Sequence, residues 1–389
     1  MILAEGVARL GSETAFEVLA RAAELQAKGR DIINLGIGQP DFRTPDHVVE
    51  AGIKALKDGQ HGYTPANGIL PLREAVAADI AQRRGVEVNP DNVVIMPGGK
   101  PTMFFAIMMF GAPGVEIMYP DPGFPIYRSM IEYTGAKPVP IALREENGFA
   151  FSAEEVLSQT TGKTRLIILN SPGNPTGGVT PRVEVDRLVA GLDTGFPDVC
   201  ILSDEIYSRM LYDGREHVSF LEYPEVRDRV IMLDGWSKTY AMTGWRLGYS
   251  VWPDHLVDPI TRFCVNAHSC VNAATQFAGI AALTGPQHPV DEMMAAFDAR
   301  RQAIVPLLNR LPGFQCQNPA GAFYAFPNIT GTGMGARDLQ SRILEEAGVA
   351  TISGTSFGKH GADFIRFSYA NSVENIERAV ERIGDLLAA

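Results

Sequence analysis

At 389 residues, the chain is longer than one hydrophobic core usually supports, so its length predicts two domains or three. Its composition, 46% hydrophobic and 20% charged, is that of a globular protein, and its net charge of −11 argues against nucleic acid or an anionic membrane as the main partner. Four cysteines without a CxxC pair predict neither a disulfide framework nor a zinc site, and reduced thiols fit a cytoplasmic location.

The N-terminal segment predicts a helix rather than a targeting signal. It has no basic region followed by an apolar stretch, so we expect no signal peptide. Residues 14–30 have the pattern of an amphipathic helix, and the apolar turn INLGIGQPDF follows. The apolar run at 104–112 is too short to span a bilayer. We therefore expect a soluble protein.

Apolar runs that end in loops rich in Gly, Pro, Asn or Asp recur through the middle of the chain. These runs are NVVIMPGGK, VEIMYPDPG, RLIILNSPGNPTGG, VCILSDEIY, VIMLDGWSK and WRLGYSVW. Because they alternate with helical stretches, they predict buried strands of a mainly parallel α/β sheet. The working loops of such sheets lie beyond the carboxyl ends of the strands. The polar residues that end each run are therefore the candidate site residues.

The C-terminal part of the chain has a different pattern. From about residue 290, long helical patterns surround short strand candidates such as FYAFPN and FIRFSYA. We predict a small α+β domain built from both termini around a large central domain. Residues 1–45 would form an N-terminal arm and part of the small domain, 46–285 the large domain, and 286–389 the rest of the small domain.

Three of the strand ends in the first half of the chain carry candidate binding groups. PGGK, with Gly99 and Lys100, opens a helix whose backbone N–H groups could hold an anion. Phe124 could stack on an aromatic ring or be an ordinary core residue. Asn174 in NPTGG could donate its side-chain amide to an oxyanion, or the loop could be purely structural.

The carboxylate that ends VCILSDEIY has two interpretations. Asp204 is either a helix N-cap or a permanent anion opposite the protonated ring nitrogen of a pyridine cofactor. Tyr207 could donate to the phenolic oxygen of such a ring, or it could be a core aromatic.

Three basic residues complete the set. Lys238 follows a strand-like run, where burial and neighbouring cations would lower its pKa, as an imine-forming amine requires. Arg246 has the charge and geometry of a phosphate ligand, with a surface salt bridge as the alternative. Arg366 lies between aromatic residues on a strand, and a substrate α-carboxylate would supply the anionic partner that its burial requires.

Taken together, SKTYAMTGWRLG, NSPGNPTGG, SDEIY, YTPANGILPLREA, the GQPDF turn and FIRFSYA resemble the fold-type I pyridoxal-phosphate aminotransferases of class I/II. More narrowly, they resemble the bacterial aspartate aminotransferase branch, from about residue 5 to the C-terminus. The resemblance implies an α/β fold with a central, mostly parallel, seven-stranded sheet and a smaller α+β domain. It also implies a transaminase that passes the α-amino group of an L-amino acid to a 2-oxo acid by a ping-pong mechanism.

For the cofactor ring, the resemblance implies a role for each matching residue. Lys238 would hold pyridoxal 5′-phosphate as a Schiff base and move the proton of the substrate α-carbon. Asp204 would pair with the ring nitrogen, and Tyr207 and Asn174 would bond the phenolic oxygen. Phe124 would stack on the ring, where the family often has Trp or Tyr.

The resemblance also implies ligands for the phosphate and for the substrate. The phosphate would be surrounded by Gly99, Lys100, Ser237 and Arg246. Tyr63 would reach the phosphate of the partner subunit's cofactor, which implies a homodimer with shared active sites. Arg366 would bind the substrate α-carboxylate, helped by Asn174 and the Gly38 backbone.

Two positions depart from the family pattern, and a third position, Lys100, leaves the class of substrate open. Gly235 stands where the family usually has a phosphate-binding Ser, and Gln39 stands where it often has Glu. Lys100 lies where some relatives use a lysine against a distal carboxylate. The alternative, which Pro101 favours because it could redirect the loop, is a solvated lysine at the start of a helix. An aromatic or branched-chain amino donor therefore stays open.

Three other functions use the same features. A β-eliminating C–S lyase would need the same Lys238, Asp204 and Arg366, and so would an aminocyclopropane-carboxylate synthase. A non-catalytic pyridoxal-phosphate-binding regulator would need a DNA-binding domain, for which there is no room before residue 30.

Overall fold

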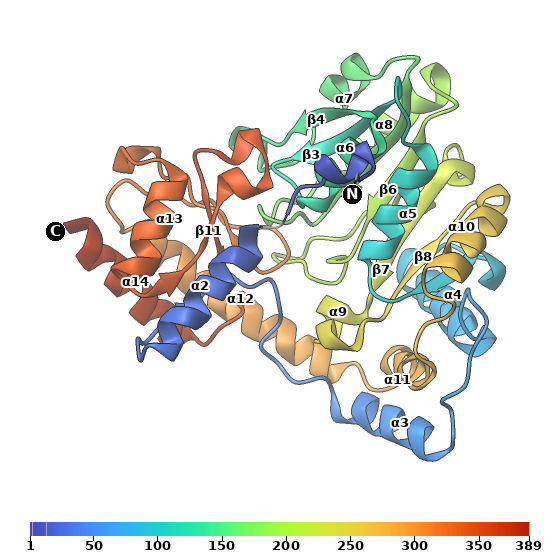
Figure 1. Cartoon of the computed structure of the whole chain (residues 1–389), viewed down its shortest axis with the longest axis horizontal. Helices are drawn as coiled ribbons and strands as arrows, with labels where there is room; N and C mark the ends of the chain where they lie inside the picture. Colours follow the sequence, from blue (N-terminus) through green and yellow to red (C-terminus); the bar gives the residue numbers. More distant parts are fainter. Residues whose placement is uncertain (2, 13, 389) are drawn as a thin grey trace.

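A seven-stranded sheet forms the centre of the larger part of the chain in the computed structural model, which describes residues 1, 3–12 and 14–388 (Figure 1). Its strands, in spatial order, are β2 (Val93–Met96), β8 (Gly248–Val251), β7 (Val230–Gly235), β6 (Cys200–Asp204), β5 (Thr164–Asn170), β3 (Glu116–Asp121) and β4 (Lys137–Ala142). Strand β8 is antiparallel to both of its neighbours and the other pairs are parallel. The predicted mainly parallel sheet is confirmed.

Helices cover both faces of this sheet, which explains why its strands are almost continuously apolar. Alternate strand residues, such as Val94 and Val93, belong to two separate cores. One core includes side chains of α5 (Lys100–Phe110), α6 (Ile126–Thr134) and α10 (Asp254–Ala267). The other includes side chains of α4 (Leu70–Arg84), α7 (Ala153–Gln159), α8 (Arg182–Gly195) and α11 (Ala273–Thr284).

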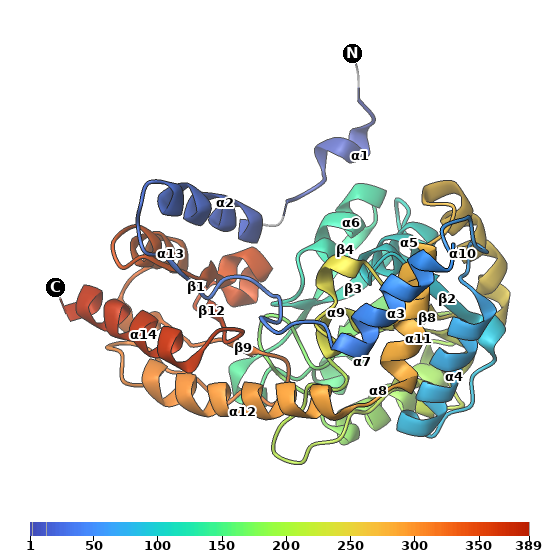
Figure 2. The ribbon, with the colours of Figure 1, turned by 90° about the horizontal axis from the view of Figure 1, so that it is seen from below.

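The smaller part of the chain combines segments from both ends of the sequence. An antiparallel sheet is formed by β11 (Ile352–Ser353), β12 (Ile365–Ser368) and β9 (Tyr324–Ala325). Strand β1 (Ile33–Asn34) pairs with β10 (Val349–Ala350), so the N-terminal segment joins the C-terminal one. Around them lie α2 (Thr14–Ala27), α12 (His288–Leu308), α13 (Ala336–Glu345) and α14 (Val373–Ala388) (Figure 2). The exact domain boundaries stay a prediction.

Shorter helices connect these layers. Helix α1 (Glu5–Ala8) lies beside α6, where Arg9 Nε donates to the carbonyl of Glu132 at 2.8 Å. Helix α3 (Asp46–Lys57) packs on α11, and α9 (Trp236–Thr239) follows β7 directly. The 3-10 helices are η1 (Pro90–Asn92), η2 (Glu145–Asn147), η3 (Phe220–Glu222), η4 (Arg227–Arg229), η5 (Thr243–Trp245), η6 (Thr330–Thr332), η7 (Gly354–Phe357) and η8 (Lys359–Gly361). Among the described residues, no helix has both the length and the apolar character needed to cross a bilayer.

Candidate active site

A cavity of ≈ 300 Å³ lies where the carboxyl ends of the central strands meet the small sheet. The candidate residues from the sequence that line it are Gly38, Gly99, Lys100, Phe124, Asn174, Asp204, Tyr207, Ser237, Lys238, Arg246 and Arg366. Tyr63 stands apart from them, with 93% of its surface exposed. The fold therefore brings together side chains that are up to 328 positions apart, from Gly38 to Arg366.

Lys238 is a buried amine in this cavity. It lies on α9, immediately after β7, and its Nζ donates to the carbonyl of Gly38 at 2.5 Å. Burial, with a smaller contribution from the positive charges of Arg366, Arg246 and Lys100, lowers the pKa of Lys238 to about 7 against a weaker opposing effect of Asp204. The side chain can thus be a neutral amine near neutral pH, which is the form that acts as a nucleophile and base.

Asp204 is a buried carboxylate at the end of β6, in the same cavity. Tyr127 donates to its Oδ2 at 2.5 Å, and the backbone N–H of Ile206 donates to its Oδ1 at 3.2 Å. Burial, with a smaller contribution from the charges of Asp234 and Glu205, raises the pKa of Asp204 to about 6 in spite of these two bonds. A positive group opposite Asp204 would favour its ionised form.

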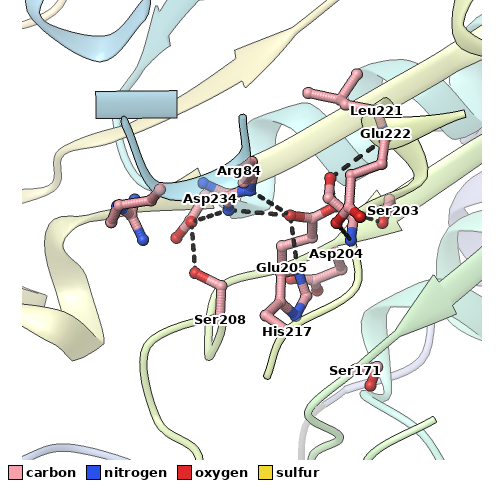
Figure 3. A network of polar contacts seen from close by, with 12 residues as sticks. Arg84, Ser171, Ser203, Asp204, Glu205, Ser208, His217, Leu221, Glu222 and Asp234 are labelled. Carbon is pink, nitrogen blue, oxygen red and sulfur yellow. Dashed lines mark hydrogen bonds and ion pairs between the residues drawn. The ribbon is translucent and has the colours of Figure 1, made fainter. Parts of the chain in front are cut away.

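Behind Asp204, a network of buried charges joins the ends of β6 and β7 (Figure 3). Arg84 of α4 donates to Glu205 Oε2 at 3.0 Å and to Asp234 Oδ2 at 2.8 Å, and His217 Nε2 lies 2.8 Å from the same Glu205 oxygen. Removing one partner of such a buried pair typically costs about 3–5 kcal/mol. The network therefore fixes the two strand ends that carry Asp204 and lead to Lys238.

A cradle for an anion lies at the start of α5. The guanidinium of Arg246 donates to the carbonyls of Thr243 at 2.8 Å and Pro97 at 3.3 Å. Gly98 has a φ of +89°, and a Cβ at this position would lie 2.2 Å from Arg246 Nη2. Glycine thus lets the guanidinium lie directly against the turn that opens α5. A cation beside a helix N-terminus is a suitable site for a phosphate.

The departure at Gly235 has a packing explanation. Gly235 pairs with Gly248 in the β7–β8 ladder. A Cβ on Gly235 would lie 2.8 Å from the Cα of Gly248, so a serine does not fit here unless the backbone shifts. Ser237, two residues later, lines the cavity, and so does Thr243, so side-chain hydroxyls are available at this end without a serine at position 235.

Arg366 is held on strand β12 with its guanidinium plane fixed. It donates to Asn174 Oδ1 at 2.8 Å and to the carbonyl of Gly36 at 2.6 Å. The rings of Tyr324 and Phe357 lie 4.6 Å and 4.8 Å from its guanidinium carbon. Stacking of this kind orients the planar fork that binds a carboxylate through two bonds.

Tyr207 and Gly38 are engaged within the protein. The hydroxyl of Tyr207 lies 2.8 Å from that of Tyr324, and both side chains are buried. Gly38 offers its carbonyl to Lys238, and a Cβ here would lie 2.5 Å from the Tyr324 hydroxyl. Tyr324 therefore packs against three candidate residues, Tyr207, Gly38 and Arg366. The sequence of its strand did not indicate this role.

Lys100, another residue of the cavity lining, lies among aromatic rings. Its Nζ is 5.2 Å from the ring centre of Phe124 and 5.7 Å from that of Phe16 on α2. Pro101 occupies the first turn of α5, where proline is tolerated, and Lys100 still lines the cavity. Lys100 therefore lies at the cavity with Pro101 in place.

Comparisons with known proteins agree on one family. A family model described as "Aminotransferase class I and II" matches residues 30–383. An aspartate aminotransferase of Geobacillus stearothermophilus is 36% identical and covers 100% of both chains, and one of Pyrococcus horikoshii is 37% identical over 98% of this chain and 96% of its own. The crystal structure of an aspartate aminotransferase from Rhizobium meliloti superposes with a TM-score of 0.94 at 32% identity, covering 100% of this chain and 99% of that one.

Proposed function

Because this chain belongs to the class I and II aminotransferases, in the aspartate aminotransferase branch, we propose that it moves the amino group of a dicarboxylic amino acid to a 2-oxo acid with pyridoxal 5′-phosphate held at Lys238. The chain is an amino-acid aminotransferase, and its family uses this cofactor.

The residues of the cavity fit pyridoxal phosphate. The amine of Lys238 has a pKa lowered by burial and suits an aldehyde, and Asp204 suits a protonated ring nitrogen. The space that Gly98 leaves for Arg246 suits the phosphate. When bound, the cofactor supplies a carbonyl that condenses with amines and a ring that accepts electrons from the substrate α-carbon.

The protein's own groups would then position the substrate and move its proton. Arg366 would bind the α-carboxylate and turn the Cα–H bond toward Lys238. Lys238 Nζ would take that proton and return it during each half of the ping-pong cycle. Asp204 would keep the ring nitrogen protonated throughout.

The charge of the cavity carries the substrate assignment. Among the residues that the structure describes, Lys100, Arg246 and Arg366 line it together with one carboxylate, that of Asp204. With Arg246 assigned to the phosphate and Arg366 to the α-carboxylate, Lys100 supports a second carboxylate on the substrate side chain. L-Aspartate and L-glutamate have this chemistry.

A half-reaction screen tests the assignment. We expect L-aspartate and L-glutamate to change the absorbance of the holoenzyme at lower concentrations than L-phenylalanine, L-leucine or L-alanine do. Lys100→Gln should raise the KM for L-aspartate by about 10- to 100-fold, the equivalent of a charge-assisted hydrogen bond of about 1.5–3 kcal/mol, and change the KM for L-alanine much less. Preference for L-phenylalanine would overturn the substrate class, and pyruvate formed from cystathionine would favour the lyase.

We also propose a homodimer in which Tyr63 reaches the partner subunit's cofactor phosphate. Tyr63 is 93% exposed in the single chain, and the apolar residues Ile53, Leu56 and Leu70, nearby in sequence, are exposed as well. Exposed apolar side chains of this kind support a surface that a second copy of the chain covers. Sedimentation should give twice the chain mass, and Tyr63→Phe should weaken cofactor binding by about 10-fold. A monomer with full activity would contradict this arrangement.

A further inference from the structure

A buried carboxylate outside the assigned machinery joins the large and small parts of the chain. Asp121 ends β3 and is 1% exposed. Its Oδ2 accepts the backbone N–H of Lys359 at 3.1 Å, and its Oδ1 accepts that of His360 at 2.9 Å. The backbone N–H of Gly123 donates in turn to the carbonyl of Phe357 at 2.8 Å. The turn after β3 thus binds the backbone of residues 357–360.

The approach at this contact is too close for any side chain between the two segments. Gly358 has a φ of +132°, and a Cβ on it would lie 2.2 Å from Asp121 Oδ1. His360 Nδ1 lies 3.4 Å from the same oxygen. Successive backbone N–H groups around a glycine form a concave site for an anion, and here the carboxylate of Asp121 fills it.

The segment that Asp121 holds forms one wall of the substrate site. Phe357 lines the cavity, and its ring is one of the two that stack on the Arg366 guanidinium, at 4.8 Å. The neighbouring Ser356 accepts a hydrogen bond from Thr14 at the start of α2. A shift of the 357–360 backbone would therefore move the ring that orients Arg366.

We propose that Asp121 is a positioning residue for substrate binding. By holding the backbone of residues 357–360 it keeps Phe357 against Arg366, and so it sets the plane in which Arg366 receives the substrate α-carboxylate. This inference rests on the proposed carboxylate role of Arg366. Asp121 acts through Phe357 and touches neither the substrate nor the cofactor.

Asp121→Asn is the most direct test, because asparagine keeps the shape and offers one acceptor oxygen for two N–H donors. In the holoenzyme, we expect the KM for the amino donor and the dissociation constant of succinate, an unreactive dicarboxylate, to rise about 10-fold. The kcat should change by less than about 3-fold, because the reacting groups stay in place. In the cofactor-free protein, hydrogen exchange at residues 357–360 should become faster, a readout independent of activity.

Two further variants separate positioning from general damage. Gly358→Ala should disturb the contact from the opposite side and give the same rise in KM. Asp121→Asn should add little to a Phe357→Leu variant, because both act through one ring. Glu145→Gln is the matched control, since Asn328 Nδ2 donates to Glu145 Oε2 at 3.2 Å in another contact between the two parts of the chain. It should leave KM unchanged.

An unchanged KM in both Asp121→Asn and Gly358→Ala, additive effects with Phe357→Leu, or an equal rise in Glu145→Gln overturns the inference. Gly358→Ala with its hydrogen exchange decides alone if Asp121→Asn does not fold. Arg366→Lys separates a failure of the proposed function from a failure of the inference about Asp121. An unchanged KM in Arg366→Lys would remove the carboxylate role of Arg366 itself. A raised KM in Arg366→Lys together with an unchanged KM in Asp121→Asn would remove only the role of Asp121.

Discussion

Lys238→Ala is expected to abolish transamination, with a loss in kcat of at least about 10⁴-fold. Loss of a general acid–base group alone costs about 10²–10⁴-fold, and this variant also loses the amine that would anchor the cofactor. The measurement is steady-state turnover with saturating cofactor. Borohydride reduction should attach the cofactor to the Lys238 peptide in the native enzyme and to no peptide in the variant. Turnover at a near-normal rate would show that another group is the base.

Removing the same amine should stabilise the cofactor-free protein. The pKa of Lys238 falls from 10.5 to about 7 on folding, chiefly because the side chain is buried. Between these pH values the unfolded chain binds more protons than the folded one, so the penalty is fully present below about pH 7 and is relieved as the pH rises toward 10.5. Lys238→Met, with a neutral side chain of similar length, should therefore raise the free energy of unfolding by about 2–4 kcal/mol at pH 7.

Urea unfolding of the cofactor-free proteins at pH 7 and pH 10 measures this difference. The advantage of Lys238→Met should shrink as the pH rises, because the folded lysine is already neutral above about pH 7 and the unfolded one loses its proton as the pH approaches 10.5. A variant that is less stable at pH 7, or whose advantage does not depend on pH, would contradict the burial penalty. Active-site residues commonly lower the stability of a protein in this way because their function requires an unfavourable environment.

The strand ends were predictable because burial on both faces leaves a continuous apolar run in the sequence. Asp204 follows such a run and Lys238 closely follows another, and the fold places both at one edge of the sheet. The strand β4 was not predicted from KPVPIA. Its two prolines, Pro138 and Pro140, are tolerated because β4 is the edge strand, with a neighbour on one side only.

The groups that tune the site were missed because their partners are distant in sequence. Tyr127 lies on α6, and only the fold brings its hydroxyl to Asp204. Arg84 ends an ordinary helical pattern, and its two carboxylate partners follow it by 121 and 150 positions. No local pattern of hydrophobic residues records such a contact. The main site residues are therefore recognisable from strand ends and motifs, whereas the roles of Tyr127 and Arg84 follow only from the folded structure.

Asp204→Asn should lower kcat/KM by at least about 10²-fold, because the proposed ion pair with the cofactor ring would be lost in a buried site, where removing one partner costs about 3–5 kcal/mol. Tyr127→Phe is the matched control: it removes the 2.5 Å hydrogen bond to the carboxylate and leaves the charge, so its loss should be about 10-fold or less. Full activity in Asp204→Asn would show that the ring nitrogen has no anionic partner here.

Asp204→Asn also separates the stability that the buried carboxylate costs the cofactor-free protein from the interaction that it would make with the bound cofactor. Burial raises the pKa of Asp204 from 3.8 to about 6, so in the cofactor-free protein the penalty is fully present above about pH 6 and is lost as the pH falls toward 3.8. Cofactor-free Asp204→Asn should therefore be about 1–3 kcal/mol more stable than the native protein at pH 7, and no more stable at pH 4. With saturating pyridoxal phosphate the order at pH 7 should reverse, because only the native carboxylate gains a positive partner when the cofactor binds. Thermal unfolding of the native protein and the variant, with and without the cofactor, measures these differences. If Asp204→Asn stays more stable than the native protein when the cofactor is bound, Asp204 is not the partner of the ring nitrogen.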